Sequence, residues 1–166
     1  IKLATDLIDN FQNIYEDKWL NMMRDKLGLF SEDKNDKKLI NDLLDWMKKN
    51  KADYTNTFCN LMGINSDEVY KNNDFITWKN VWKKRSVLNN STKEKQSKLM
   101  GENNPTVIPR NHKVEEALAE ADKGNLYKMK KLLTILKNPY ENQINIEEYQ
   151  SPASRSNEKY QTFCGT

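Results

Sequence analysis

The chain has 166 residues, of which 37% are hydrophobic and 31% charged, with five glycines and four prolines. This length fits one domain, or one domain with a tail, and so few turn-forming residues argue against a many-stranded sandwich or barrel. The net charge of +3, with both signs interspersed, argues against a dedicated nucleic-acid binder, and no apolar run is long enough to span a membrane. The sequence starts at Ile1 inside an amphipathic pattern, and we interpret it as a piece of a longer protein.

The first half of the chain predicts a series of amphipathic helices. Apolar residues recur at steps of three and four from Leu3 to Leu27, which predicts one long helix that ends at Gly28 in a left-handed cap. Asp53 and Asp74 are predicted to be the N-caps of later helices, because a carboxylate can accept hydrogen bonds from the first free amides. The further helices are predicted over 39–50, 54–62, 75–85 and, more weakly, 91–99, with one short turn over 66–72.

The second half is predicted to begin with an irregular segment over 101–111, since Pro105 and Pro109 bias their predecessors toward extended backbone. Two helices follow, from Asn111 or His112 to 121 and over 126–136. From Tyr140 onward the periodicity fades. We therefore predict an all-α fold. An irregular multi-helix bundle is formed by residues 1–139, and an extended C-terminal arm by residues 140–166, which ends in Thr-Phe-Cys-Gly-Thr and packs along the surface.

Few residues suit metal or phosphate chemistry. One histidine and two distant cysteines, Cys59 and Cys164, argue against a structural zinc site. The stretch 33–44 lacks the central glycine and the closing glutamate of a calcium loop, and the five glycines form no phosphate-cradling pattern. We therefore assign no catalytic, cofactor-binding or metal-binding residue within this sequence.

Three groups of side chains have both a functional and a structural interpretation. His112 could act as a general base, but an isolated histidine in the first turn of a helix more often bonds a loop carbonyl. Asp42 and Asp45 could act as paired carboxylates, but charges opposite an apolar stripe usually lie on a solvated face. Trp78 and Trp82, with basic residues beside them, resemble a stacking surface for single-stranded nucleic acid, but this spacing is more typical of a core.

Four stretches match one family in order and spacing. They are Lys26-Leu27-Gly28-Leu29, Ala52-Asp53-Tyr54-Thr55-Asn56-Thr57-Phe58, the segment from Asn104-Pro105 through Ile108-Pro109-Arg110-Asn111-His112 to Leu118, and the terminal Tyr160-Gln161-Thr162-Phe163-Cys164-Gly165-Thr166. Together they resemble the C-terminal third of the selenoprotein O family, also called YdiU or UPF0061. The resemblance implies a parent enzyme with a protein-kinase-like fold that transfers AMP from ATP to Ser, Thr or Tyr hydroxyls of proteins. It also implies that ATP and Mg²⁺ (or Mn²⁺) are bound upstream of Ile1, in a cytoplasmic bacterial protein.

The resemblance makes Cys164 a redox candidate. In some relatives the corresponding position is selenocysteine, and bacterial relatives can join that cysteine to one in the kinase-like core. The same family pattern has a basic residue after Phe58, where this chain has Cys59. From the residues alone, Cys164 is either a reactive thiol near a terminus or an inert one packed beside the terminal aromatic residues.

The motif around the two prolines also has two interpretations. Arg110 can tie a loop to two helices by binding carbonyl and carboxylate groups, or it can reach a phosphate or a substrate carboxylate in the intact protein. We favour the structural role, in which the prolines stiffen the crossover and Asn111 caps the next helix. The motif residues are Asn104, Pro105, Pro109, Arg110, Asn111 and His112.

We therefore expect a supportive, noncatalytic C-terminal region of a protein adenylyltransferase. Its expected partners are the upstream kinase-like domain and protein substrates, with no nucleic acid and no membrane. It should expose an apolar face that the missing lobe covers, and it should not bind ATP by itself. The alternatives are a stand-alone helical protein-interaction module and a nucleic-acid binder that uses Trp78 and Trp82.

Overall fold

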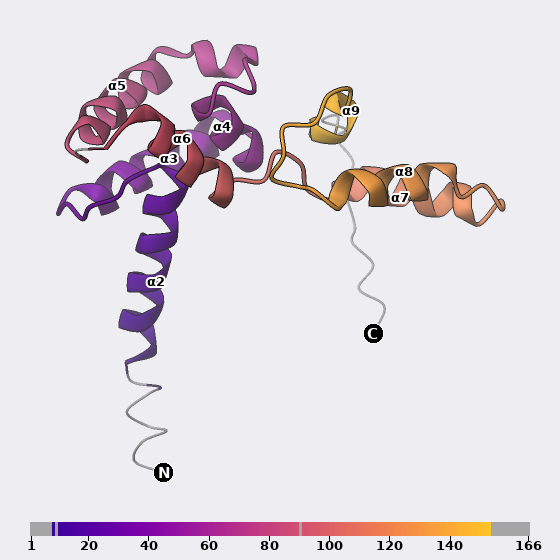
Figure 1. Ribbon diagram of the computed structural model, residues 1–166, viewed down its shortest axis with the longest axis horizontal. Coiled ribbons are helices and arrows are strands. Elements are labelled where there is room, and N and C mark those ends of the chain that lie inside the picture. The colour runs from indigo at the N-terminus through magenta and orange to yellow at the C-terminus, as the bar shows by residue number, and fades with distance from the viewer. Residues whose placement is uncertain (1–7, 9, 90, 154–166) are drawn as a thin grey trace.

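The computed structural model describes residues 8, 10–89 and 91–153, and this part of the chain is all-helical, as predicted. The helices form two units that lie side by side along the long axis of the molecule (Figure 1). The first unit contains α2 (Phe11–Lys26), α3 (Asp36–Asn50), α4 (Tyr54–Leu61), the 3-10 helix η1 (Glu68–Lys71), α5 (Asn73–Val87) and α6 (Lys93–Asn103). The second contains α7 (Asn111–Ala121), α8 (Tyr127–Leu136) and the single turn α9 (Glu147–Gln150).

The helix ends follow the sequence signals in part. Asp53 caps α4 by accepting a hydrogen bond from the amide of Asn56, as predicted. The cap of α5 is Asn72 and not Asp74, which lies in the first turn. Both residues can cap a helix, and the extended backbone that a cap requires occurs at Asn72.

Gly28 ends the first helix in the left-handed conformation, with a φ of 66°. A Cβ atom at this position would also lie 2.5 Å from Cγ of Gln96 in α6. The glycine therefore allows both the sharp exit from α2 and the close approach of α6.

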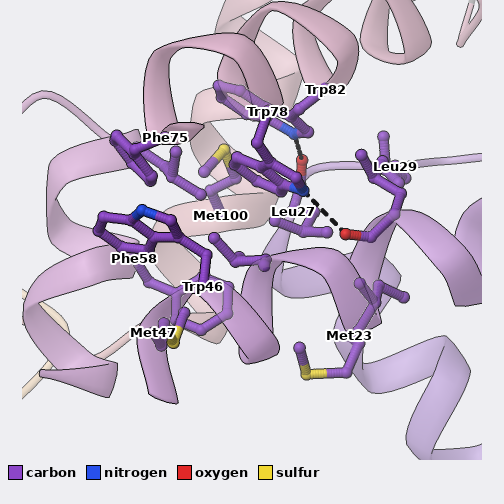
Figure 2. Close-up of a cluster of buried hydrophobic side chains, with 14 of the residues drawn as sticks. Met23, Leu27, Leu29, Trp46, Met47, Phe58, Phe75, Trp78, Trp82 and Met100 are labelled. Carbon is purple, nitrogen blue, oxygen red and sulfur yellow. Dashed lines mark hydrogen bonds between the residues drawn. The ribbon is translucent and has the colours of Figure 1, made fainter. Parts of the chain in front are cut away.

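The core of the first unit is built around aromatic rings from α3, η1 and α5 (Figure 2). The rings of Trp78 and Trp82 lie parallel, with centroids 6.3 Å apart. Their indole nitrogens donate to backbone oxygens, Trp78 to Leu39 at 2.8 Å and Trp82 to Leu27 at 2.9 Å. Both indoles are therefore buried parts of the core, and they are not available to stack on bases.

The crossover between the two units is shorter than the sequence predicts. Helix α6 continues to Asn103, so Gly101 is helical and the irregular segment begins at Asn104. Helix α7 begins at Asn111, but its N-cap is Arg110 with no side-chain cap, so the capping role predicted for Asn111 is wrong.

The second unit has its own hydrophobic cluster, which includes the first part of the predicted C-terminal arm. Helices α7 and α8 form an antiparallel hairpin that extends away from the first unit (Figure 1). Ile146 and Tyr149 pack against this hairpin together with Val107 of the crossover. The domain boundary after residue 139 stays a prediction. Within the described ranges, no helix is long and apolar enough to cross a membrane.

Candidate functional site

The proline-arginine motif lies at the junction between the two units. The guanidinium of Arg110 makes a bidentate ion pair with Asp53, with Nη1 to Oδ2 at 2.6 Å and Nη2 to Oδ1 at 2.9 Å. Both side chains are well shielded, with exposed fractions of 10% for Arg110 and 19% for Asp53. Arg110 also donates to the backbone oxygen of Gln150 at 2.9 Å. One guanidinium thus joins the start of α4, the start of α7 and the end of α9.

The amide side chains of two further residues complete this junction. Asn56 is 3% exposed and donates to the backbone oxygen of Gln150, while its own oxygen accepts from Arg110. The side-chain amide of Gln150 donates to the backbone oxygen of Thr106 at 3.0 Å. Nothing in the sequence pattern around Gln150 indicated this role, since it lies where the periodicity has faded.

The first residues of the crossover are fixed to the end of α2. The side-chain amide of Asn104 donates to the backbone oxygens of Lys26 and Met100 at 2.8 and 2.9 Å. In turn, Nζ of Lys26 donates a hydrogen bond to the backbone oxygen of Asn103, and its ammonium group lies 4.9 Å from the ring centroid of Phe58. Two of the four matching stretches, at 26–29 and at 104–105, are therefore in direct contact.

The remaining motif residues have simpler surroundings. His112 lies in the first turn of α7, as predicted, and is half-buried. Among the described residues, no loop carbonyl accepts a hydrogen bond from its imidazole, so the bond considered for it from the sequence is not found there. The terminal segment with Cys164 lies outside the described residues.

Cys59 lines a small cavity beside the junction. The cavity has a volume of about 210 Å³ and lies between α4, the loop at 64–67 and the chain around α9. The thiol is 2% exposed and lies 3.8 Å from the backbone oxygen of Pro105. Burial, with a smaller contribution from the Asp53 carboxylate, raises the pKa of the Cys59 thiol to about 11. In this structure Cys59 is therefore a buried, protonated thiol of low reactivity.

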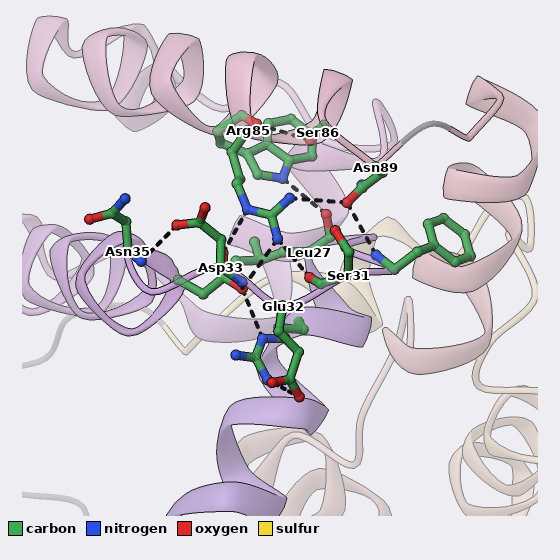
Figure 3. A network of polar contacts seen from close by, with 12 residues as sticks. Leu27, Ser31, Glu32, Asp33, Asn35, Arg85, Ser86 and Asn89 are labelled. Carbon is green, nitrogen blue, oxygen red and sulfur yellow. Dashed lines mark hydrogen bonds and ion pairs between the residues drawn. The ribbon is translucent and has the colours of Figure 1, made fainter.

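A second polar cluster is buried inside the first unit, and the sequence analysis missed it. The carboxylate of Asp36 is fully buried and accepts from Nε of Arg24 at 2.8 Å and from Nε of Arg85 at 2.7 Å. Arg85 also reaches the backbone oxygen of Ser31 at 2.6 Å (Figure 3). The available signal was the position of Arg85, three residues after Trp82 on the same face of α5.

The charged side chains of these clusters are paired with one another. The guanidinium groups of Arg24, Arg85 and Arg110 all hold carboxylates. Asp42 is exposed and pairs with Lys38, in agreement with a solvated helix face. In the part of the chain that the structure covers, no three His, Cys, Asp or Glu side chains group as metal ligands.

Comparison with known proteins identifies the family. The sequence profile described as "Protein adenylyltransferase SelO" matches residues 2–137. The chain belongs to the SelO family. It is 58% identical to the "Protein nucleotidyltransferase YdiU" of Pelagibacter ubique over 168 residues, and 46% identical to that of Clostridium botulinum (strain Eklund 17B) over 170 residues. Each alignment covers all of this chain but only 35% and 34% of the relative, respectively, so the chain spans about a third of their length.

The predicted family is thereby confirmed, and the SelO motifs at 52–58 and 104–118 can be placed in space. The first contributes Asp53 and Asn56 to the junction, and the second contributes Arg110. In this SelO chain the two motifs are therefore joined by an internal ion pair that also holds Gln150.

Two arginine-paired carboxylates, the buried Asp36 and the partly buried Asp53, make the stability of this SelO chain depend on pH. Burial raises the pKa of Asp36, but hydrogen bonds from Arg85 and Arg24 outweigh it and leave this pKa below its ordinary value. Burial also raises the pKa of Asp53. The hydrogen bonds from Arg110 and the Asn56 amide lower it by more, so the pKa of Asp53 also lies below its ordinary value. Between these lowered values and the ordinary pKa of about 3.9, the unfolded chain binds more protons than the folded chain.

We therefore expect the free energy of unfolding to be nearly constant from about pH 5 to pH 7 and to fall as the pH drops through about 4 and below. Urea titrations at successive pH values, followed by tryptophan fluorescence, measure this dependence. Asp53→Asn should reduce the acid-side slope, because one of the two carboxylates is removed. Stability that rises on acidification, or an unchanged slope in Asp53→Asn, contradicts the assignment.

Proposed function

We propose that this chain is the C-terminal helical region of a protein adenylyltransferase, which transfers AMP from ATP to Ser, Thr or Tyr hydroxyls of proteins. In this proposal the region supports the enzyme and is not itself catalytic. The family profile and the relatives named as nucleotidyltransferases support the activity of the parent protein. The fraction of those relatives that the chain covers, about one third, supports its being one part of a larger enzyme.

The observation that carries the supporting role is an uncovered apolar face on α2. Phe11, Tyr15 and Met22 recur at helical spacing along this face, with exposed fractions of 66%, 58% and 44%. The rings of Phe11 and Tyr15 stack on each other with centroids 6.3 Å apart. The N-terminal half of α2 projects from the first unit (Figure 1). Contiguous exposed apolar side chains of this kind are typical of a surface that another part of the protein covers.

We propose that the upstream kinase-like domain of the parent covers this face. Helix α2 is the first helix of the described chain, so it is close in sequence to whatever precedes Ile1 in the parent. ATP and Mg²⁺ (or Mn²⁺) are assigned to that upstream domain on the family alone, and the three described arginines, Arg24, Arg85 and Arg110, are already paired with carboxylates. Protein substrates, a cytoplasmic location and redox control through Cys164 belong to the same proposal and are supported by the family alone.

The experiment is a labelling assay in the presence of Mg²⁺ or Mn²⁺. It uses an ATP analogue with the label in its AMP portion, which is the part that is transferred to the protein. We expect this chain to label neither itself nor a protein mixture, while the full-length Pelagibacter ubique relative serves as the positive control. A thermal melt with and without ATP is run in parallel, since a ligand that binds the native state raises Tm.

Labelling by residues 1–166 alone, or an ATP-dependent rise in their Tm, would show that the chain has a nucleotide site and would overturn the supporting role. If neither the chain nor the relative transfers AMP, the proposed parent activity fails. In that case, the stand-alone interaction module becomes the better interpretation.

A further inference from the structure

We propose that the second unit, α7 to α9, is a hinged module that an ion pair between Arg110 and Asp53 holds closed against α4. When this ion pair breaks, the second unit can move away from α4 and expose the cavity that Cys59 lines. The proposal goes beyond the supporting role of the chain, because it gives the region a conformational device of its own.

The two units have separate cores. The hydrophobic cluster of the first unit is drawn from α2 to α6, and that of the second from the crossover, α7, α8 and α9. The two clusters share no residue. A boundary between two cores, crossed by few apolar contacts, is where relative motion of two parts is expected.

The main chain passes from one unit to the other over a very short segment. Asn104 is fixed to the first unit through Lys26 and Met100. Thr106, two residues later, is fixed to the second unit, where its amide donates to Pro139 at 2.7 Å and its hydroxyl to Glu141 at 2.7 Å. The change from one unit to the other therefore occurs at Pro105, over a single residue of main chain. Proline fixes φ of this residue, so a relative motion of the two units uses rotation about the ψ angles of Asn104 and Pro105.

The polar contacts between the two units converge on α4 and its N-cap. Asp53 receives two bonds from Arg110, and Asn56 exchanges bonds with Arg110 and Gln150. Cys59, one turn further along α4, lies against the backbone oxygen of Pro105. A shielded bidentate pair of this kind contributes more than an exposed one, so its loss weakens the whole contact.

Cys59 offers a direct measure of the closed state. Its thiol is 2% exposed, and the cavity that it lines has the chain around α9 as one wall. When the second unit moves away from α4, the cavity loses this wall, and a thiol reagent can reach Cys59. Asn60 and Lys79, which lie close to Cys59 in the first unit, have their hydrogen-bond partners within that unit and do not resist the movement.

The test measures the rate at which N-ethylmaleimide modifies Cys59 in a Cys164→Ser background at fixed pH. Asp53→Asn removes the ion pair but keeps a side chain that can cap α4. We expect it to raise the rate at least tenfold. Asp74→Asn, which removes the exposed pair with Lys49, is the matched control and should leave the rate within twofold.

A second variant separates opening from electrostatics. The Asp53 carboxylate raises the pKa of Cys59, so Asp53→Asn would make the thiol somewhat more reactive even in a closed molecule. Arg110→Lys keeps the positive charge but cannot form the bidentate pair, so a faster reaction in this variant reports opening. Hydrogen exchange of the same variants should increase around the start of α7 and in α9, and stay unchanged in α3 and α5.

The proposal is overturned if neither variant changes the rate at Cys59. It is also overturned if hydrogen exchange in α3 and α5 increases together with the rate of Cys59 modification, because the first unit would then open along with the second.

Discussion

Replacing Asp36 by asparagine is expected to cost this chain about 3–5 kcal/mol in the free energy of unfolding. The carboxylate is fully buried and holds two guanidinium groups, those of Arg24 and Arg85, which are each 8% exposed. Asparagine has a similar size, but it removes the carboxylate that Arg85 pairs with and leaves Arg24 with only the exposed Glu32, 3.1 Å from its Nη1. Because whole domains are stable by about 5–15 kcal/mol, this single change removes a large part of the total. Urea unfolding with an unchanged m value measures it.

The matched control is Asp42→Asn on the same helix. Asp42 pairs with Lys38 at 2.7 Å, but the pair is exposed, so its loss should change stability by about 1 kcal/mol or less. A triple change of Arg24→Met, Asp36→Leu and Arg85→Met removes the three buried charges of this cluster together and should recover much of the loss. Equal effects of Asp36→Asn and Asp42→Asn would show that the buried cluster has no special role.

The helices were predictable because each buries one apolar stripe, and the stripe repeats with the period of the helix. This signal located α3, α4, α5 and α8 to within a few residues. It also placed Trp78 and Trp82 in the core, where both lie. The caps were less predictable, since Asn72 and Asp74 have similar capping ability and the choice depends on how the chain enters α5 from η1.

The polar clusters were only partly predictable, because their members are far apart in the sequence. Asp36 lies 12 residues from Arg24 and 49 from Arg85, and only tertiary packing brings them together. Arg110 could be recognised as a hub from the motif around it, but its carboxylate partner had to be chosen among many acidic residues. Asp53 was interpreted as a helix cap, and the structure gives it both roles.

Replacing Trp82 by alanine should cost about 3–5 kcal/mol, because it removes a large buried ring and leaves a cavity at the centre of the first unit. The ring lies parallel to Trp78, with 4° between the planes, and its nitrogen satisfies the backbone oxygen of Leu27. Leu27 itself is fully buried, so no solvent can replace that donor. Trp82→Phe keeps most of the volume and loses only the donor, and we expect it to cost about 1–3 kcal/mol.

Val81 provides the control for this prediction, since it is the preceding residue of α5 but points outward with an exposed fraction of 53%. Val81→Ala therefore has the same helix context without a cavity, and its effect should stay within about 0.5 kcal/mol. The order of stability should be Val81→Ala, then Trp82→Phe, then Trp82→Ala, each measured by urea unfolding. If Trp82→Ala were as stable as Val81→Ala, the ring could not lie in the core, and a stacking surface for nucleic acid would again have to be considered.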